Sequence, residues 1–302
     1  MINTWQAKAI RKKASFKKRP STINIQAVAS AEKRLISTTG RLTPVTFYYP
    51  VTSGTAKLPI YINLHGGGFV HGDASQDDPY CRYIANEASC LVVNINYAKA
   101  PESPFPAALE ESYEVIKWVV DHAESLGADK DRLAVGGQSA GGNLAAALTL
   151  LAAIRKEFSF SKQILNYPVL DLVTPAEEKP VLDENRVIPA KQMTFYNNCY
   201  VLDKESAKNP LASPIMAENM NGVPPALVIT AEYDSLAEEA ELYAAKLTKH
   251  GIEAEHRRFD GCEHAFTHDG PNRQAEEAWE LIAGSLKTSL HTNEPASSST
   301  TK

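Results

Sequence analysis

A serine lies where a sharp turn would expose it as a nucleophile. The pattern Gly-x-Ser-x-Gly spans residues 137–141, with an apolar run before it and an alanine- and leucine-rich helical period after it. A tight turn from strand to helix strains the backbone at the serine, and glycines on both sides let the chain pass close to itself. The hydroxyl then projects at a helix N-terminus, where the helix dipole favours negative charge. We predict that Ser139 attacks an acyl group; a plain glycine-rich turn is the alternative.

A second glycine-rich segment, His65–Phe69, directly follows the apolar run Leu58–Leu64. Backbone amides in such a loop can stabilise the oxygen anion formed during acyl transfer, because glycines let the backbone come close. One such donor lowers the barrier by about 2.7–4 kcal/mol. A phosphate-binding loop is the alternative, but neither a GxGxxG pattern nor a Walker lysine accompanies the run. We expect His65 and Gly66 to support the loop rather than to react.

The base is expected late in the chain. When a serine of this kind follows a strand of a parallel sheet, the acid comes next and the histidine last. His264 lies in a loop just after the apolar run Ala254–Phe259, where it can reach over the sheet edge to the serine. His268 is the second choice, whereas His256 falls inside the predicted strand and His291 in the tail. We predict His264 as the base.

The acid is expected after the preceding strand. Asp234 follows the apolar run Ala226–Thr230 and comes after the turn, where its carboxylate can accept the imidazole proton. Glu232 and Asp260 are the lesser candidates. A helix cap on the period Leu236–His250 is the non-catalytic interpretation of Asp234. We predict Asp234 as the third member of the triad.

Strand-like and helical segments alternate along most of the chain and must position these residues. The apolar runs are Leu58–Leu64, Leu91–Tyr97, Arg132–Gly136, Gln163–Tyr167, Ala226–Thr230 and Ala254–Phe259. The helical periods are clearest at Ala107–Ser125, Gly141–Ile154, Leu236–His250 and Arg273–Leu290. Fully apolar strands between amphipathic helices indicate an α/β fold with a mostly parallel central sheet flanked by helices.

Two segments interrupt this alternation. Residues 171–220 contain five prolines and one short helical segment. We expect them to form, with the N-terminal segment 1–40, a helical cap over the carboxyl-terminal edge of the sheet. Residues 41–170 and 221–291 then make the core. The small, polar tail at 292–302 is predicted to be disordered.

The charge is divided unevenly along the 302 residues. The net charge is −5, yet the first 20 residues carry seven basic residues and no acidic one, which leaves 24 basic and 36 acidic residues in the remainder, a formal −12. An acidic protein argues against nucleic acid as the main partner. The basic segment predicts a helix packed on the main domain; attachment to a membrane surface is the sharper alternative, and a mobile arm is the third.

The four cysteines, Cys81, Cys90, Cys199 and Cys262, are widely spaced and form no CxxC pair. Scattered thiols of this kind are typical of a reducing compartment. No apolar run approaches the roughly 20 residues that span a bilayer, and no apolar stretch follows the basic N-terminus as in a secretory signal. We therefore expect a cytoplasmic protein without stable membrane insertion.

Taken together, the segments resemble the hormone-sensitive-lipase family of α/β hydrolases, particularly its bacterial esterases. The resemblance runs from about Pro59 to Phe266. Its motifs are HGGGF at His65–Phe69, YAKAPE at Tyr97–Glu102, PAALEE at Pro106–Glu111, GQSAGGN at Gly137–Asn143, ASP at Ala212–Pro214, PPALVITAEYD at Pro224–Asp234 and EHAF at Glu263–Phe266.

The resemblance implies an α/β-hydrolase fold with a helical cap, and no cofactor or metal. Gly67, Gly68 and Ala140 would supply the oxyanion amides. The chain departs from the family in three places: the family usually has Asp at Gln138, Arg-Leu at residues 98–99, and Gly at Ala265. These positions brace the site rather than react, so pocket shape and acyl preference are affected more than the reaction class.

The implied activity is that of a serine carboxylesterase, which hydrolyses small, short-chain acyl esters through an acyl-enzyme. A non-catalytic ligand receptor, of the kind the plant gibberellin receptors represent on this fold, is one alternative. A peptidase is another, although many of those carry a large extra domain for which this chain lacks room. The resemblance also mildly favours a homodimer.

Overall fold

A computed structural model describes residues 4–16, 20–51, 57–270 and 272–291, so the predicted disordered tail lies outside the described residues. Within them, eight strands form one sheet in the order β1-β2-β4-β3-β5-β6-β7-β8. The pairs from β4 through β8 are parallel, whereas β1 pairs with β2, and β2 with β4, in antiparallel fashion. The strands are β1 Ser30–Ser37, β2 Leu42–Tyr49, β3 Leu58–Leu64, β4 Leu91–Ile95, β5 Ala128–Gln138, β6 Lys162–Asn166, β7 Ala226–Tyr233 and β8 Ala254–Glu263. The predicted mostly parallel sheet is confirmed.

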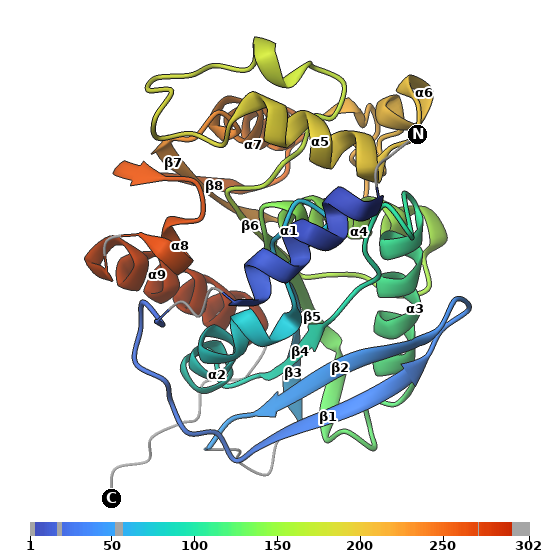
Figure 1. Ribbon diagram of the computed structural model, residues 1–302. Coiled ribbons are helices and arrows are strands. Elements are labelled where there is room, and N and C mark those ends of the chain that lie inside the picture. The colour runs from blue at the N-terminus through green and yellow to red at the C-terminus, as the bar shows by residue number, and fades with distance from the viewer. Residues whose placement is uncertain (1–3, 17–19, 52–56, 271, 292–302) are drawn as a thin grey trace, which may run out of the picture.

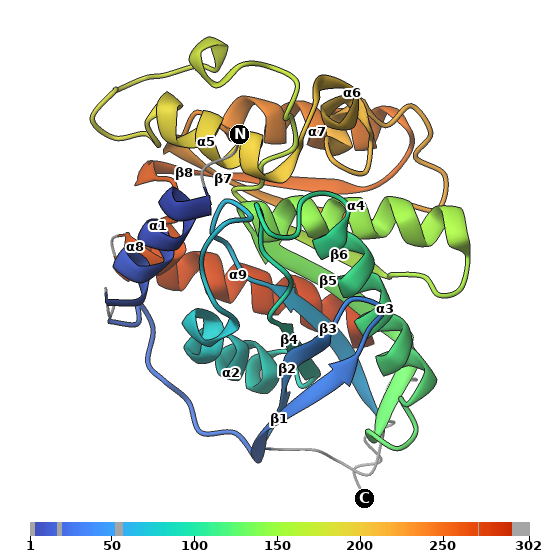
Figure 2. The same ribbon diagram turned by 45° about the vertical axis from the view of Figure 1, so that its right-hand side comes forward.

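Helices cover both faces of this sheet (Figure 1, Figure 2): α3 and α4 lie on one face, and α2 and α9 on the other. The helices are α1 Thr4–Phe16, α2 Asp78–Glu87, α3 Ala107–Asp121, α4 Ala140–Arg155, α5 Ala190–Tyr200, α6 Lys204–Lys208, α7 Ala237–Lys249, α8 Phe266–Asp269 and α9 Asn272–His291. Short 3-10 turns are η1 Ala74–Asp77, η2 Ala176–Glu178 and η3 Pro214–Met216. In the described part of the chain, no helix combines the length and apolar character needed to cross a bilayer.

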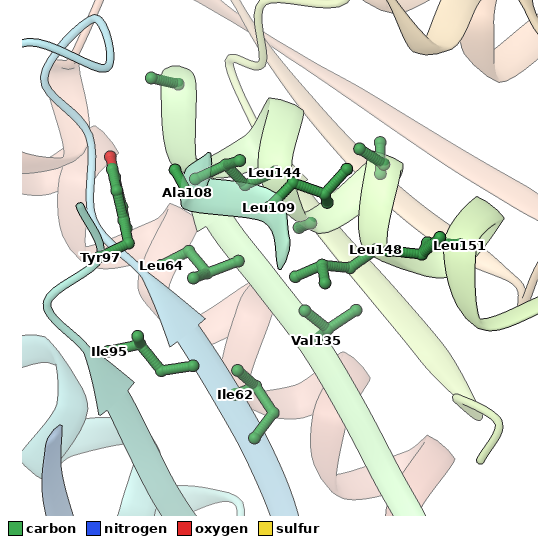
Figure 3. Close-up of a cluster of buried hydrophobic side chains, with 14 of the residues drawn as sticks. Ile62, Leu64, Ile95, Tyr97, Ala108, Leu109, Val135, Leu144, Leu148 and Leu151 are labelled. Atoms are coloured by element: carbon green, nitrogen blue, oxygen red, sulfur yellow. The ribbon is translucent and has the colours of Figure 1, made fainter. Parts of the chain in front are cut away.

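The core follows from the alternation of side chains along the central strands. All seven residues of β3 are buried. Figure 3 shows Ile62 of β3 and Val135 of β5 in one apolar cluster with Leu148 of α4. The preceding position, Tyr61, points to the other face and belongs to the cluster that contains Trp279 of α9. Because both faces are covered, the central strands β3 and β4 are buried at every position, and each buried aliphatic side chain contributes about 1.5–3 kcal/mol.

The antiparallel hairpin of β1 and β2 was not predicted. β1 lies at the sheet edge, and Ile36 is its one buried residue, so it carries no continuous apolar run. Residues 30–37, placed by the sequence in the cap segment 1–40, therefore extend the sheet instead. The predicted boundary at residue 40 divides the hairpin. Among the described residues of segment 1–40, α1 is the one helix.

The basic N-terminal segment forms α1, which packs on the rest of the molecule. Ala7 is fully buried. Arg11 donates through Nε to Val70 O at 2.7 Å and through Nη2 to Ala100 O at 2.6 Å, and it pairs with Glu102 at 2.6 Å. Figures 1 and 2 show α1 and α5 together above the carboxyl ends of the parallel strands. The packed helix expected for this segment is thus observed.

Candidate active site

Three side chains from three separate segments meet at the carboxyl-terminal edge of the sheet. Ser139 follows β5, Asp234 follows β7, and His264 follows β8. His264 Nε2 lies 2.9 Å from Ser139 Oγ, and His264 Nδ1 lies 2.7 Å from Asp234 Oδ2. A carboxylate oxygen can only accept, so Nδ1–H donates to Asp234 and the bare Nε2 accepts from the serine hydroxyl. The predicted triad residues are therefore brought into one hydrogen-bonded chain.

Burial orients this chain. The side chain of Asp234 is 1% exposed and that of His264 is 10% exposed. Asp234 Oδ1, the oxygen that does not face the imidazole, accepts from Leu236 N at 3.0 Å at the start of α7. The carboxylate is thus held by two donors, and one of them fixes the imidazole tautomer that leaves Nε2 free to take a proton.

The serine turn is strained in the way that its sequence predicts. Ser139 has φ 55° and ψ −115°, outside the regions that L-residues ordinarily occupy. Such a conformation costs about 1–3 kcal/mol and persists where the surrounding structure enforces it. A Cβ at Gly137 would lie 2.5 Å from Gly141 O, and one at Gly141 would lie 2.0 Å from Leu64 O. Glycine at both positions is therefore a steric requirement of the turn.

The glycine loop beside the serine has a backbone that favours glycine. Gly67 has φ +135°, and a Cβ there would lie 2.1 Å from His71 O. The ring of Tyr196, from α5, lies directly against Gly68, so that a Cβ on that glycine would come within 2.5 Å of the ring. In the described parts of the chain, no group accepts from the backbone nitrogens of Gly67, Gly68 or Ala140. These amides can therefore donate to an anion.

His65 lies buried at the base of this loop. Its Nδ1–H donates to Gly66 O at 2.8 Å, and its ring stacks on Tyr97 with centroids 4.2 Å apart. The Tyr97 hydroxyl donates in turn to His65 O at 2.6 Å. Burial, followed by the charge of Lys99, lowers the pKa of His65 to about 4. The imidazole is therefore neutral near pH 7 and contacts the loop rather than the serine.

The other histidines that the sequence offered as bases face different partners. His268 Nε2 lies 3.0 Å from Asp77 Oδ1. His256 Nε2 lies 2.8 Å from Thr230 Oγ1, within the sheet. His291, at the end of α9, lies 3.0 Å through Nε2 from a main-chain oxygen. Among the four candidate histidines, His264 is the one whose ring reaches Ser139.

The alternative acids are also engaged elsewhere. Glu232 Oε2 accepts from Gly261 N at 2.7 Å, which ties the end of β7 to β8. Asp260 is a largely exposed residue that lies 3.7 Å from Arg258. Asp234 therefore differs from both in burial and in contact with an imidazole.

Comparison with known proteins places this architecture in a family. Residues 61–268, more than half of the chain, match a family model described as the alpha/beta hydrolase fold. The protein is a hormone-sensitive-lipase-like α/β hydrolase. The resemblance seen in its motifs is thereby confirmed, together with the fold class.

Several named relatives of this α/β hydrolase are esterases. An arylesterase of Saccharolobus solfataricus is 33% identical over 249 residues, which cover 81% of this chain and 78% of the relative. Carboxylesterase NlhH of Mycobacterium tuberculosis is 35% identical over 70% of this chain and 67% of its own. Among solved structures, a hyperthermophilic esterase from Pyrobaculum calidifontis superposes with a TM-score of 0.83 at 36% identity over 93% of both chains. The thermophilic carboxylesterase EstE1, cloned from a metagenomic library, gives 0.84 at 34% identity over 96% of this chain and 98% of that one.

The departures from the family pattern at residues 98–99 lie in a braced segment of the hydrolase. Ala98 N donates to the buried Glu111 carboxylate. Lys99 Nζ donates to Asn96 Oδ1 at 2.7 Å and to Tyr97 O at 3.0 Å. Burial lowers the pKa of Lys99 to about 8. This lysine therefore caps its own turn at the foot of the His65 loop.

The other two departures flank the triad. Ala265, next to the histidine, has φ 65°, a left-handed conformation that glycine adopts without strain, which explains the family's usual Gly there. The side-chain amide of Gln138 faces two acceptors, Asp77 Oδ2 and Leu64 O, both at 3.0 Å, so we assign its nitrogen to that side, where it can donate to both. The residue next to the serine is therefore a donor to a buried carboxylate rather than a carboxylate itself.

Two residues of this region escaped the sequence analysis. Asp77 is fully buried although it lies in an acidic, polar stretch, and Tyr167 packs its ring edge on His264 with centroids 5.0 Å apart. Tyr167 ends a predicted strand at the carboxyl-terminal edge of the sheet, and from that position its place near the site could have been predicted. Asp77 offered no comparable signal.

Proposed function

We propose that this α/β hydrolase is a serine carboxylesterase that hydrolyses short-chain acyl esters of small molecules. The observation that carries the proposal is the hydrogen-bonded chain from Ser139 Oγ through His264 to Asp234, with links of 2.9 and 2.7 Å. The esterase names of its relatives support the same chemistry. Ser139 is the nucleophile, His264 the base and Asp234 the acid that orients it.

In the first step, Ser139 Oγ attacks the ester carbonyl carbon as its proton moves to His264 Nε2. The carbonyl electron pair moves onto oxygen, and the amides of Gly67, Gly68 and Ala140 donate to that anion. The anion then collapses, the bond to the alcohol oxygen breaks, and the alcohol leaves with the proton from His264. The product is an acyl ester on Ser139.

In the second step, water attacks the acyl carbon and gives a proton to His264 Nε2. The same three amides receive the second oxygen anion. Collapse breaks the bond to Ser139 Oγ, which takes the proton back from His264, and the carboxylic acid leaves. The cycle consumes one water and returns the serine and histidine to their starting forms.

A small acyl group is favoured by what lies over the site. The ring of Tyr196, which is almost fully buried, packs on Gly68. It therefore limits the space for an acyl group beside the proposed oxyanion amides. We infer that α1 and residues 171–220 form the cap, and that its helix α5 limits the length of the acyl chain. Four buried, unpaired cysteines support a cytoplasmic location. A homodimer remains a prediction from the resemblance.

The test is hydrolysis of p-nitrophenyl esters from acetate to palmitate by the wild type and by Ser139→Ala. We expect the wild type to cleave the short chains and the variant to lose nearly all turnover while keeping its fold, as measured by circular dichroism. Retained activity in Ser139→Ala would reject the nucleophile. A folded wild type that binds small acyl ligands but cleaves no ester would instead favour a receptor.

A further inference from the structure

A second histidine–aspartate pair lies beside the proposed triad. His268 Nε2 is 3.0 Å from Asp77 Oδ1, and the two side chains are 12% and 1% exposed. Asp77 ends η1, which follows the glycine loop, and His268 lies in α8, four residues after His264. The pair therefore joins the segment that carries the base to the segment that carries the oxyanion amides.

The Asp77 carboxylate also reaches the serine turn. Its Oδ2 accepts from Asn63 Nδ2 at 2.8 Å and from the side-chain nitrogen of Gln138 at 3.0 Å. Gln138 is the residue immediately before Ser139 in the strained turn. One buried carboxylate thus receives donors from β3, from the serine turn and from α8. A carboxylate accepts several such bonds well, and charge-assisted bonds of this kind are roughly twice as strong as neutral ones.

The far nitrogen of His268 continues the contacts toward the base. His268 Nδ1 lies 3.0 Å from the hydroxyl of Tyr167 and 3.0 Å from Thr267 Oγ1. The ring of Tyr167 meets the His264 ring edge-on, with centroids 5.0 Å apart. His268 itself packs against Tyr80, 4.4 Å away. The imidazole of His264 is therefore bordered by a residue that His268 holds in place.

The segment around His264 needs such contacts because it is short and strained. Ala265 has a positive φ, and α8 spans only four residues. Other bonds fix its far side, since Thr267 O accepts from Thr22 Oγ1 at 2.6 Å and from Trp279 Nε1 at 3.1 Å. Those contacts tie the segment to α9 and the N-terminal region. The chain from His268 through Asp77 to Gln138 ties it to the serine turn.

We propose that His268, Asp77 and Gln138 form a positioning network that sets the distance between His264 and Ser139. This inference rests on the proposed esterase function and adds residues that touch neither substrate nor the reacting atoms. Loss of the His268 link lets the α8 segment shift against the serine turn. A displacement of about 1 Å at reacting groups can cost about 100-fold in rate, so the expected effect falls on kcat rather than on KM.

The test compares His268→Phe, His268→Gln and the control His256→Phe. Phenylalanine preserves the ring that packs on Tyr80 but removes the hydrogen bonds of both ring nitrogens, to Asp77, Tyr167 and Thr267. Glutamine offers a donor nitrogen and an acceptor oxygen in place of the two ring nitrogens of a neutral imidazole, and is the conservative rescue. His256 lies in β8 and bonds Thr230, outside the network. The readouts are kcat and KM for p-nitrophenyl acetate, normalised to active sites titrated with a fluorophosphonate, and the downfield proton resonance of His264 Nδ1–H.

We expect His268→Phe to lower kcat about 100-fold with KM little changed and to shift the His264 resonance. His268→Gln should recover at least part of the loss, and His256→Phe should match the wild type. Wild-type kcat and an unshifted resonance in folded His268→Phe would overturn the network, as would a loss that vanishes after normalisation to titrated sites. If the wild type cleaves no ester, the esterase proposal fails, and the resonance in the two His268 variants still decides the network.

Discussion

Two histidines that stand four residues apart in this hydrolase, His264 and His268, each pair with an aspartate, and they differ in what the second imidazole nitrogen faces. In Asp234–His264 it faces the hydroxyl of a serine in a strained turn, at 2.9 Å. In Asp77–His268 it faces buried hydroxyls of Tyr167 and Thr267. The pair alone therefore does not make a base for catalysis.

The difference lies in the surroundings of each ring. Beside His264 is Ser139, the proposed nucleophile, and the serine turn and the glycine loop next to it hold three amides that no described group accepts from. Beside His268 are rings and hydroxyls that close the space, with Tyr80 at 4.4 Å. In our proposals, one pair moves a proton and the other holds segments together. Substitutions that are matched between the pairs test this division.

The largest contrast is expected between His264→Phe and His268→Phe. Loss of the base should lower kcat by about 10⁶-fold, as removal of a triad histidine does in other serine hydrolases. Loss of the positioning ring should lower it by about 100-fold. Single-turnover rates with p-nitrophenyl acetate measure both. Equal losses would show that the two rings share one role.

The aspartates should differ by a smaller factor. Asp234→Asn leaves the geometry nearly intact but favours the wrong imidazole tautomer, and we expect kcat to fall by about 10⁴-fold. Asp77→Asn keeps one acceptor for its three donors and should cost no more than about 100-fold. Steady-state kinetics at pH 8 give the ratio. A larger loss in Asp77→Asn than in Asp234→Asn would reverse the assignment of roles.

A third histidine, His65, bonds a backbone carbonyl instead of a carboxylate, and burial is the largest cause of its shifted pKa. Its folded pKa of about 4 lies below the ordinary 6.5. Between these values the unfolded chain binds a proton that the folded protein does not, so stability is lost as pH falls through this window. The loss should reach about 3 kcal/mol. We expect urea unfolding at pH 7 and pH 4.5 to give a smaller change in the free energy of unfolding for His65→Phe than for the wild type. An equal change in both proteins would contradict the burial effect.

The smallest effect is expected where the two pairs meet. Tyr167→Phe keeps the ring against His264 but removes the hydroxyl that bonds His268 and Thr267. One buried hydrogen bond contributes about 0.5–1.5 kcal/mol, so kcat should fall about tenfold at most. Pre-steady-state acylation rates measure the change. Combined with His268→Phe, the loss should be less than the product of the two single losses, because both act through one contact.

The part of the site that local sequence determines was predictable. Ser139 and the glycines around it satisfy steric requirements within a few residues, and those requirements are visible as a motif. Asp234 and His264 followed from the order of segments along the chain. The structure brings all three residues together at hydrogen-bond distance.

What escaped prediction depends on contacts between distant segments or on exposed edges. Asp77 and His268 are 191 residues apart, and no pattern links an acidic stretch after the glycine loop to a histidine in α8. β1 has one buried residue, so edge pairing rather than hydrophobicity makes it a strand. The reason that Gln138 is accepted where the family has Asp is likewise visible only once Asp77 lies beside it.

The contacts of α1 have a consequence for the order of assembly during synthesis. Arg11 binds carbonyl oxygens of Val70 and Ala100, which leave the ribosome some 60 and 90 residues after it. At a translation rate of about 5–20 residues per second, α1 waits several seconds for its docking surface. An isolated helix of 13 residues is marginal in water over that interval. This N-terminal segment therefore docks after the strands that follow it, and a nascent chain that is halted before residue 102 should leave α1 open to protease.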